Sequence, residues 1–251
     1  MVQNRSDDDR PRGRSRAGDE RNGGDRGRDD RRPYQRAERK PRKIIKPVKK
    51  RGKTVFDVKL FNRWDSNVAV NDPSLKGYIN LDPKILPRSA GTQRGRFHKS
   101  KMHIVERLAL KMLVSGHVGK KHRLTSGKFS GNYTNVIDVV ERAMEMIEKK
   151  ENKNPVEVLV RAIENAALRE EVISFQMGSI MARESVITAP QRRVDKTLRA
   201  IAQSAYRRAF NKNKGLAEAL ADELLAAYKN SADSFAIKEK ERVEREATGA
   251  R

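Results

Sequence analysis

One face of a helix that we expect to begin at Pro190 carries a line of polar side chains, most of them cationic. At 100° per residue, the members of this line fall within about 80° of one another. They are Arg192, Lys196, Arg199, Gln203 and Arg207. Apolar residues occupy the opposite side of the same helix. A cationic line about 20 Å long, at 1.5 Å per residue, suits consecutive backbone phosphates. The pattern therefore predicts electrostatic binding of a polyanion, and the alternative is an ordinary solvated helix face.

Further cations gather before this helix, around residues 94–101 and in a glycine-rich loop at 116–132. Arg193, in the first turn of the expected helix, and Arg183, upstream of it, are also candidates for binding a polyanion. All the candidates outside the line itself are Arg94, Arg96, Lys99, Lys101, Lys120, Lys121, Arg123, Lys128, Arg183 and Arg193. The loop lacks the glycine spacing of a nucleotide-binding phosphate loop. Its two histidines, His117 and His122, have no further ligands at useful spacing, so we expect neither a metal nor a cofactor.

The elements that must position these side chains are mostly helices. Apolar periodicity predicts helices over 101–114 and 134–149, then from Pro155, from Pro190, over 216–229 and from Phe235. The stretch 169–189 alternates like two strands around a turn near Met177–Met181, which predicts a β-hairpin arm running straight into the basic helix. The expected fold is mainly α: a single helical domain of about six helices with a protruding β-hairpin arm, plus a disordered basic N-terminal tail.

Composition sets the boundary of that tail and the class of partner. The chain of 251 residues has a formal net charge of +23 and a pI near 10.4. Residues 1–53 hold 20 lysines and arginines against 9 acids, with few large apolar residues, so we expect a disordered tail there and a folded domain over 54–251. Either an RNA-seeking arm or a solubilising leader fits this tail. So large a positive excess favours nucleic acid as the partner.

Targeting signals and catalytic motifs are both missing from the sequence. It contains no apolar run of transmembrane length, no apolar leader and no cysteine, which favours a cytoplasmic protein without a membrane partner. No nucleophile-elbow or zinc-protease motif occurs. Glu170 and Glu171 are adjacent carboxylates, but neighbours on a strand point to opposite faces, which is wrong for a paired acid and base. We therefore expect a binding protein, not an enzyme.

The kind of nucleic acid is narrowed by what the chain lacks. Aromatic residues make up only 5% of it, too few for the stacking platforms of single-strand binders. No helix-turn-helix spacing suggests a reader of duplex DNA. These observations favour backbone-directed binding to folded RNA. A protein that binds duplex nucleic acid without preference and an RNA-modifying enzyme are the alternatives.

Several blocks in the same order give the sequence a family resemblance. They include Leu-Phe-Asn-Arg-Trp at 60–64, Asp-Pro-Ser-Leu-Lys-Gly-Tyr-Ile at 72–79 and Ala-Pro-Gln-Arg-Arg-Val-Asp-Lys-Thr-Leu at 189–198. Further blocks lie at 86–91, 104–108, 154–165, 220–224 and 234–241. From about Lys59 onward the chain thus resembles the universal small-subunit ribosomal protein seven family, in its archaeal/eukaryotic branch. The residues 1–53 lie outside the resemblance.

The resemblance implies a structural protein of the small ribosomal subunit without catalytic activity. Such proteins bind the 3′ major (head) domain of small-subunit rRNA, nucleate assembly of the head and lie near the exit-site tRNA and the mRNA path. Neighbouring head and platform ribosomal proteins are the implied protein partners. Arg192, Arg193 and Lys196 match the family's basic stretch after the hairpin, and Arg96 and Lys99 form the next group.

Two departures from the family pattern concern the loop and the arm. The family's Gly-Lys-Lys has two matches here, Gly119-Lys120-Lys121 by residue type and Gly131-Asn132-Tyr133 by distance along the chain. The hairpin of relatives is arginine-rich, whereas here Arg183 stands among mainly uncharged residues. We therefore expect the tip of the arm to contact its partner by shape and apolar surface more than by charge.

Overall fold

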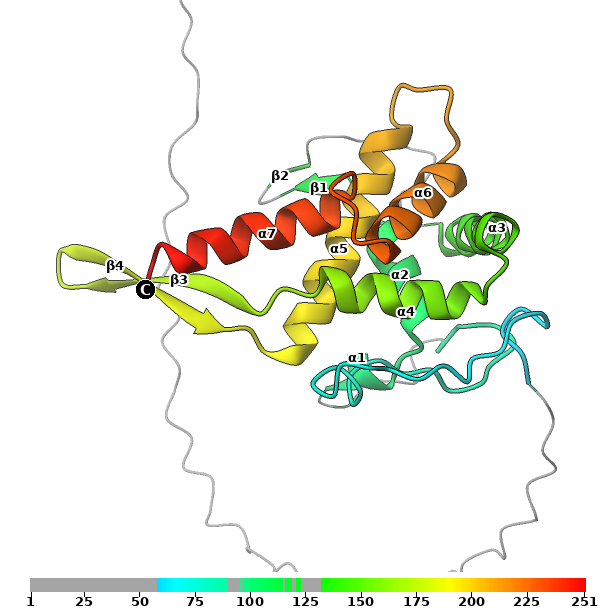
Figure 1. Ribbon diagram of the computed structural model, residues 1–251, viewed down its shortest axis with the longest axis horizontal. Coiled ribbons are helices and arrows are strands. Elements are labelled where there is room, and N and C mark those ends of the chain that lie inside the picture. The colour runs from blue at the N-terminus through cyan, green and yellow to red at the C-terminus, as the bar shows by residue number, and fades with distance from the viewer. Residues whose placement is uncertain (1–57, 90–94, 96, 115, 119–120, 123–131) are drawn as a thin grey trace, which may run out of the picture. The chain divides into compact units, whose positions relative to one another are not determined.

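The computed structural model describes residues 58–89, 95, 97–114, 116–118, 121–122 and 132–251. Within them, seven helices and two small antiparallel sheets follow one another along the chain (Figure 1). The helices are α1 (His98–Lys101), α2 (Ile104–Met112), α3 (Tyr133–Glu151), α4 (Pro155–Ala166), α5 (Pro190–Ala209), α6 (Leu216–Tyr228) and α7 (Phe235–Thr248). The strands are β1 (His117–Val118), β2 (Lys121–His122), β3 (Glu170–Met177) and β4 (Ile180–Ile187).

Helix α5 is central to the packing, because α2, α6 and α7 all lie against it. Its side chains Val194, Leu198 and Ile201 are completely buried, which confirms the apolar side expected from the sequence. Helix α4 contributes a second buried face and begins where the sequence predicts. Asn154 caps it by accepting a hydrogen bond from the backbone N–H of Val156 (3.0 Å), and Pro155 occupies the first turn, where a missing N–H costs nothing.

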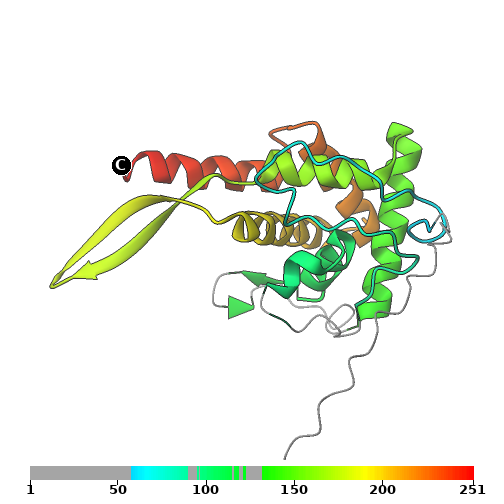
Figure 2. The same ribbon diagram turned by 90° about the horizontal axis from the view of Figure 1, so that it is seen from below.

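The segment 58–89 has no regular helix or strand and lies across α3 and α4 (Figure 2). Leu60, Trp64 and Leu75 bury their side chains in the common core. Polar contacts fix its path: the indole N–H of Trp64 donates to Glu148 (3.2 Å), and Glu164 accepts from the backbone N–H of Asn71 (2.6 Å). The segment is thus an integral layer of the helical domain.

The hairpin of β3 and β4 projects beyond the helices (Figures 1 and 2). Met177 pairs with Ile180, so the loop holds two residues, Gly178 and Ser179. Only the first of them has a positive φ (+62°), as in a type II′ turn, and this conformation favours glycine. Met177, Ile180 and Met181 are 63% to 69% exposed around the turn. The expected β-hairpin arm is therefore confirmed, and its tip is apolar and exposed.

The expected helices are present, with one correction at the first. The sequence predicts a helix over 101–114, but α2 begins at Ile104 and ends at Met112, and a separate single turn, α1, precedes it. The break occurs because Met102 and His103 are extended, with ψ near 140°, and the imidazole Nδ1 of His103 caps α2 by accepting from the N–H of Val105 (3.2 Å). The expected tail at 1–53 lies outside the described residues.

Candidate nucleic-acid interface

The first turns of α5 carry two cations that share one carboxylate. The Nε of Arg192 lies 2.6 Å from Glu171 on β3, and Lys196 forms a second ion pair with the same side chain. Burial alone would raise the pKa of Glu171, but the hydrogen bonds from Arg192 and Lys196 outweigh it and lower the pKa below its usual range. Because Arg192 is 58% exposed and Glu171 only 12%, the solvent-facing charge here is positive.

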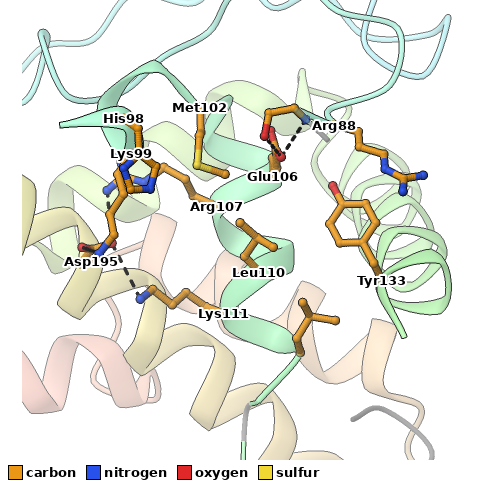
Figure 3. Close-up of a pocket in the computed structure, with 12 residues that line it drawn as sticks. Arg88, His98, Lys99, Met102, Glu106, Arg107, Leu110, Lys111, Tyr133 and Asp195 are labelled. Carbon is orange, nitrogen blue, oxygen red and sulfur yellow. Dashed lines mark hydrogen bonds and ion pairs between the residues drawn. The ribbon is translucent and has the colours of Figure 1, made fainter. Parts of the chain in front are cut away.

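A second carboxylate on the same helix gathers three more cations. Asp195 lies 3.1 Å from Lys99 on α1, 3.3 Å from Arg107 and 3.9 Å from Lys111 on α2 (Figure 3). Burial raises the pKa of Asp195, and these cations lower it by more. The pKa of Lys111 is lowered by burial and by the neighbouring cations, in spite of Asp195. This group joins α1, α2 and α5 into one surface on which positive charge exceeds negative.

The remaining members of the expected line lie farther along α5. Arg199 is exposed and has no hydrogen bond or ion pair within the described part of the chain. Gln203 is half-buried. The guanidinium of Arg207 lies 4.8 Å from the ring centroid of Phe235, a cation–π contact that holds it against α7. The line therefore exists, but Arg199 is its least restrained cation.

Arg193 points away from this line, into the base of the arm. Its Nε donates to the carbonyl oxygen of Leu168 (2.9 Å) and its Nη2 to Asp72 (3.0 Å), while Nη1 contacts Ser74. Its side chain is only 11% exposed. The structure thus separates Arg193 from Arg192 and Lys196, with which the sequence groups it, and uses it to tie segment 58–89 to the start of the hairpin.

The other candidates are placed in part. Lys101 and Arg183 are exposed, on α1 and in the middle of β4. For Lys121 only the backbone is described, in β2. The candidates outside the described residues are Arg94, Arg96, Lys120, Arg123 and Lys128. Of the two matches to the family's Gly-Lys-Lys, the later one includes Asn132, which caps α3 by accepting from the N–H of Asn135 (3.2 Å).

A cleft of about 610 Å³ borders this surface, and the sequence does not reveal it (Figure 3). Arg88, Glu106 and Tyr133 line its end away from Asp195. Burial and the charge of Glu106 raise the pKa of Tyr133 to about 12, so its hydroxyl keeps its proton and donates to the carbonyl of Pro87 (2.9 Å). The only sequence signal was the spacing of Arg107 and Lys111, one turn apart on a helix.

Neither a membrane-spanning helix nor a cluster of metal ligands occurs among the described residues. None of the helices described there is long and apolar enough to cross a membrane. Among the same residues, no three histidine, cysteine or acidic side chains come together as metal ligands.

Comparison with known proteins assigns the chain to a family. Residues 75–251 match the family model described as ribosomal protein S7p/S5e. The chain belongs to this family. Three archaeal proteins named small ribosomal subunit protein uS7 are similar to it. The one from Nanoarchaeum equitans is 44% identical over 196 residues, covering 77% of this chain and 99% of the relative. Those from Methanococcus maripaludis and Archaeoglobus fulgidus are each 43% identical and covered over their whole length, by 78% and 80% of this chain.

Family membership confirms the resemblance found in the sequence. The family consists of structural ribosomal proteins, so the expectation that the protein is not an enzyme is confirmed. The relatives align over nearly all of their own length, whereas part of this chain has no counterpart in them.

Proposed function

We propose that this protein works in the cytoplasm, within the small ribosomal subunit, where its domain at 54–251 binds the 3′ major (head) domain of the rRNA. In this role it nucleates assembly of the head and lies near the exit-site tRNA and the mRNA path. Neighbouring head and platform proteins are its protein partners. The names of the archaeal relatives and the match to their family support this proposal.

The cationic surface of α1, α2 and α5 is the observation that carries the RNA-binding part of the proposal. Lys99, Lys111, Arg192, Lys196 and Arg199 lie on elements that pack together, and the carboxylates of Glu171 and Asp195 neutralise only some of this charge. These carboxylates also hold Lys99, Arg192 and Lys196 in fixed directions before RNA arrives. A pre-oriented set of cations loses less side-chain entropy when it meets phosphates.

The arm and the tail have different roles in this proposal. The apolar tip at Met177, Ile180 and Met181 contacts a neighbouring surface by shape. The tail at 1–53 adds cations that follow the rRNA backbone, as its net positive charge supports. Both contacts extend the footprint of the helical domain beyond its own surface.

A salt titration with matched variants tests the role of α5. The measured quantity is the slope of the logarithm of the binding constant for the cell's own small-subunit rRNA against the logarithm of the salt concentration. In the variant R192A/K196A/R199A this slope flattens by roughly two units, because each phosphate contact contributes about 0.7–0.9. The control K149A/K238A/R245A removes exposed cations on α3 and α7 and keeps the slope. Equal slopes in both variants would remove α5 from the interface.

Two further measurements test the identity of the partner. The unmodified protein co-sediments with small subunits after a high-salt wash, and head-domain rRNA displaces it from labelled rRNA far better than random duplex DNA does. Equal competition by duplex DNA would instead favour a protein that binds nucleic acid without preference.

A further inference from the structure

The cleft beside the cationic surface has two kinds of wall. One end is charged, with Lys99 and Lys111 around Asp195, and the middle is apolar, with Met102 and Leu110 (Figure 3). Its volume of about 610 Å³ falls within the range of small-ligand sites, roughly 300–1,000 Å³. An anionic group joined to a flat apolar body matches such a cleft, and a nucleotide is a group of this kind.

The apolar wall is open to a ligand. Leu110 is 39% exposed although it lies between the buried Ala109 and the half-buried Lys111 of α2. Across the cleft, the ring of Tyr133 is fixed by its hydroxyl's hydrogen bond to Pro87, and the guanidinium of Arg88 lies 5.6 Å from the ring centroid. An unstacked base can pack against planar and apolar surfaces of this sort, whereas a solvated phosphate group gains nothing from contact with them.

The carboxylate of Glu106 provides independent support, because one of its oxygens lacks a hydrogen-bond donor within the described part of the chain. One of its oxygens accepts from the backbone N–H (2.8 Å) and the hydroxyl (2.6 Å) of Ser89, but its other oxygen has no donor among the described residues. Glu106 lies in the wall of the cleft and is almost fully buried, so a donor group that enters the cleft would satisfy this oxygen. The amino group of adenine, cytosine or guanine is such a donor, and so is the ring N–H of guanine or uracil.

We propose that this cleft receives one unstacked nucleotide of the rRNA. Its phosphate lies at the Lys99–Lys111 end, its base packs on Leu110 and Met102, and an N–H group on the edge of the base faces Glu106. This inference rests on the proposed function. It adds a site that recognises one base to a surface that otherwise binds only backbone phosphates.

A pair of serine variants separates this site from backbone binding. Leu110→Ser lowers affinity for the cell's own small-subunit rRNA roughly tenfold, the scale of one lost base contact, and leaves the salt slope unchanged because no charge is removed. Val114→Ser removes an exposed apolar side chain just beyond α2, outside the cleft, and keeps the affinity. Lys111→Gln flattens the slope by about one unit. Circular dichroism verifies that each variant is folded.

Crosslinking identifies the occupant in the assembled subunit. A benzophenone side chain placed at Leu113, which also lines the cleft, crosslinks to one unpaired nucleotide. Labelling of a protein or of many nucleotides would overturn the inference, as would unchanged affinity in Leu110→Ser. Those results leave the proposed function standing as long as the unmodified protein binds the rRNA. Failure of the unmodified protein to bind would refute the proposed function itself.

Discussion

His103 shows how one residue can set both a helix boundary and a pH dependence. It is completely buried, caps α2 through Nδ1, and its Nε2 has no partner among the described residues. Burial, reinforced by the charge of Lys84, lowers the pKa of His103 from 6.5 to about 4. Protonation would place a charge in the core, so the folded protein keeps this imidazole neutral.

The lowered pKa of His103 predicts how the free energy of unfolding depends on pH. The unfolded chain binds a proton below pH 6.5 and the folded chain does not, so the stability present above pH 6.5 is lost as the pH falls towards 4. The slope is about 1.4 kcal/mol per pH unit. In His103→Asn, which keeps a capping side chain, urea denaturation at pH 6.5 and pH 5 gives nearly equal free energies. An undiminished slope in this variant would assign the titration to another group.

Arg193 and Arg199 lie less than two turns apart on α5, and the structure gives them separate roles. Arg193→Ala leaves the carbonyl of Leu168 and the carboxylate of Asp72 without their donors, so it destabilises folding by roughly 2 kcal/mol. Arg199→Ala removes no contact described within the chain, so it leaves stability unchanged and flattens the salt slope of rRNA binding. Denaturation and salt titration of both variants check this. The reverse assignment of effects would contradict the structure.

Among the elements, the hairpin arm depends most on a single residue. Gly178 has φ +62° and no neighbouring atom within 4 Å of the place that a Cβ would take, so an added methyl group is strained by the backbone alone. Gly178→Ala costs about 1 kcal/mol of local stability. Because the tip is exposed, hydrogen exchange at Met177 and Ile180 accelerates while the melting temperature of the domain stays the same. Gly77→Ala, also unobstructed but without a positive φ, is the control.

Local patterns in the sequence predict the elements better than the interface. Apolar periodicity and the Asn154–Pro155 pair place α4 correctly, because capping and burial of one helix face are local properties. The interruption at His103 was not predicted, since histidine is an unusual cap and its burial depends on the rest of the fold. Glu170 and Glu171 do point to opposite sides, towards Arg251 and towards Arg192.

What the sequence could not supply is the pairing between distant residues. Nothing near Arg193 indicates that it turns towards Asp72, 121 positions away, and nothing near Asp195 indicates that Arg107 approaches it from α2. The residues expected in the line are on α5, but their carboxylate partners Glu171 and Asp195 were not foreseen, and binding of RNA by this line stays a prediction. The sequence does not predict the cleft at Leu110 for the same reason, because the walls of the cleft come from separate helices.

At the scale of the whole molecule, positive charge is divided between the helical domain and the residues 1–53. Deleting 1–53 removes 20 cations and 9 acids. We expect the deletion to flatten the salt slope for rRNA and to leave the melting temperature of the helical domain unchanged, because the core residues of the described part of the chain lie after Val58. Isothermal titration and calorimetry measure the two quantities. A lowered melting temperature would show that the tail packs on the domain.

The base of the arm is held by an element that is made later. Arg251, just after α7, forms an ion pair with Glu170 on β3, and Glu244 of α7 accepts from the backbone N–H of Arg169. The chain leaves the ribosome in order, at about 5–20 residues per second, so the arm emerges several seconds before its brace. The nascent chain therefore exposes the arm before its brace is available, and docking of α7 is the step that fixes the direction of the arm.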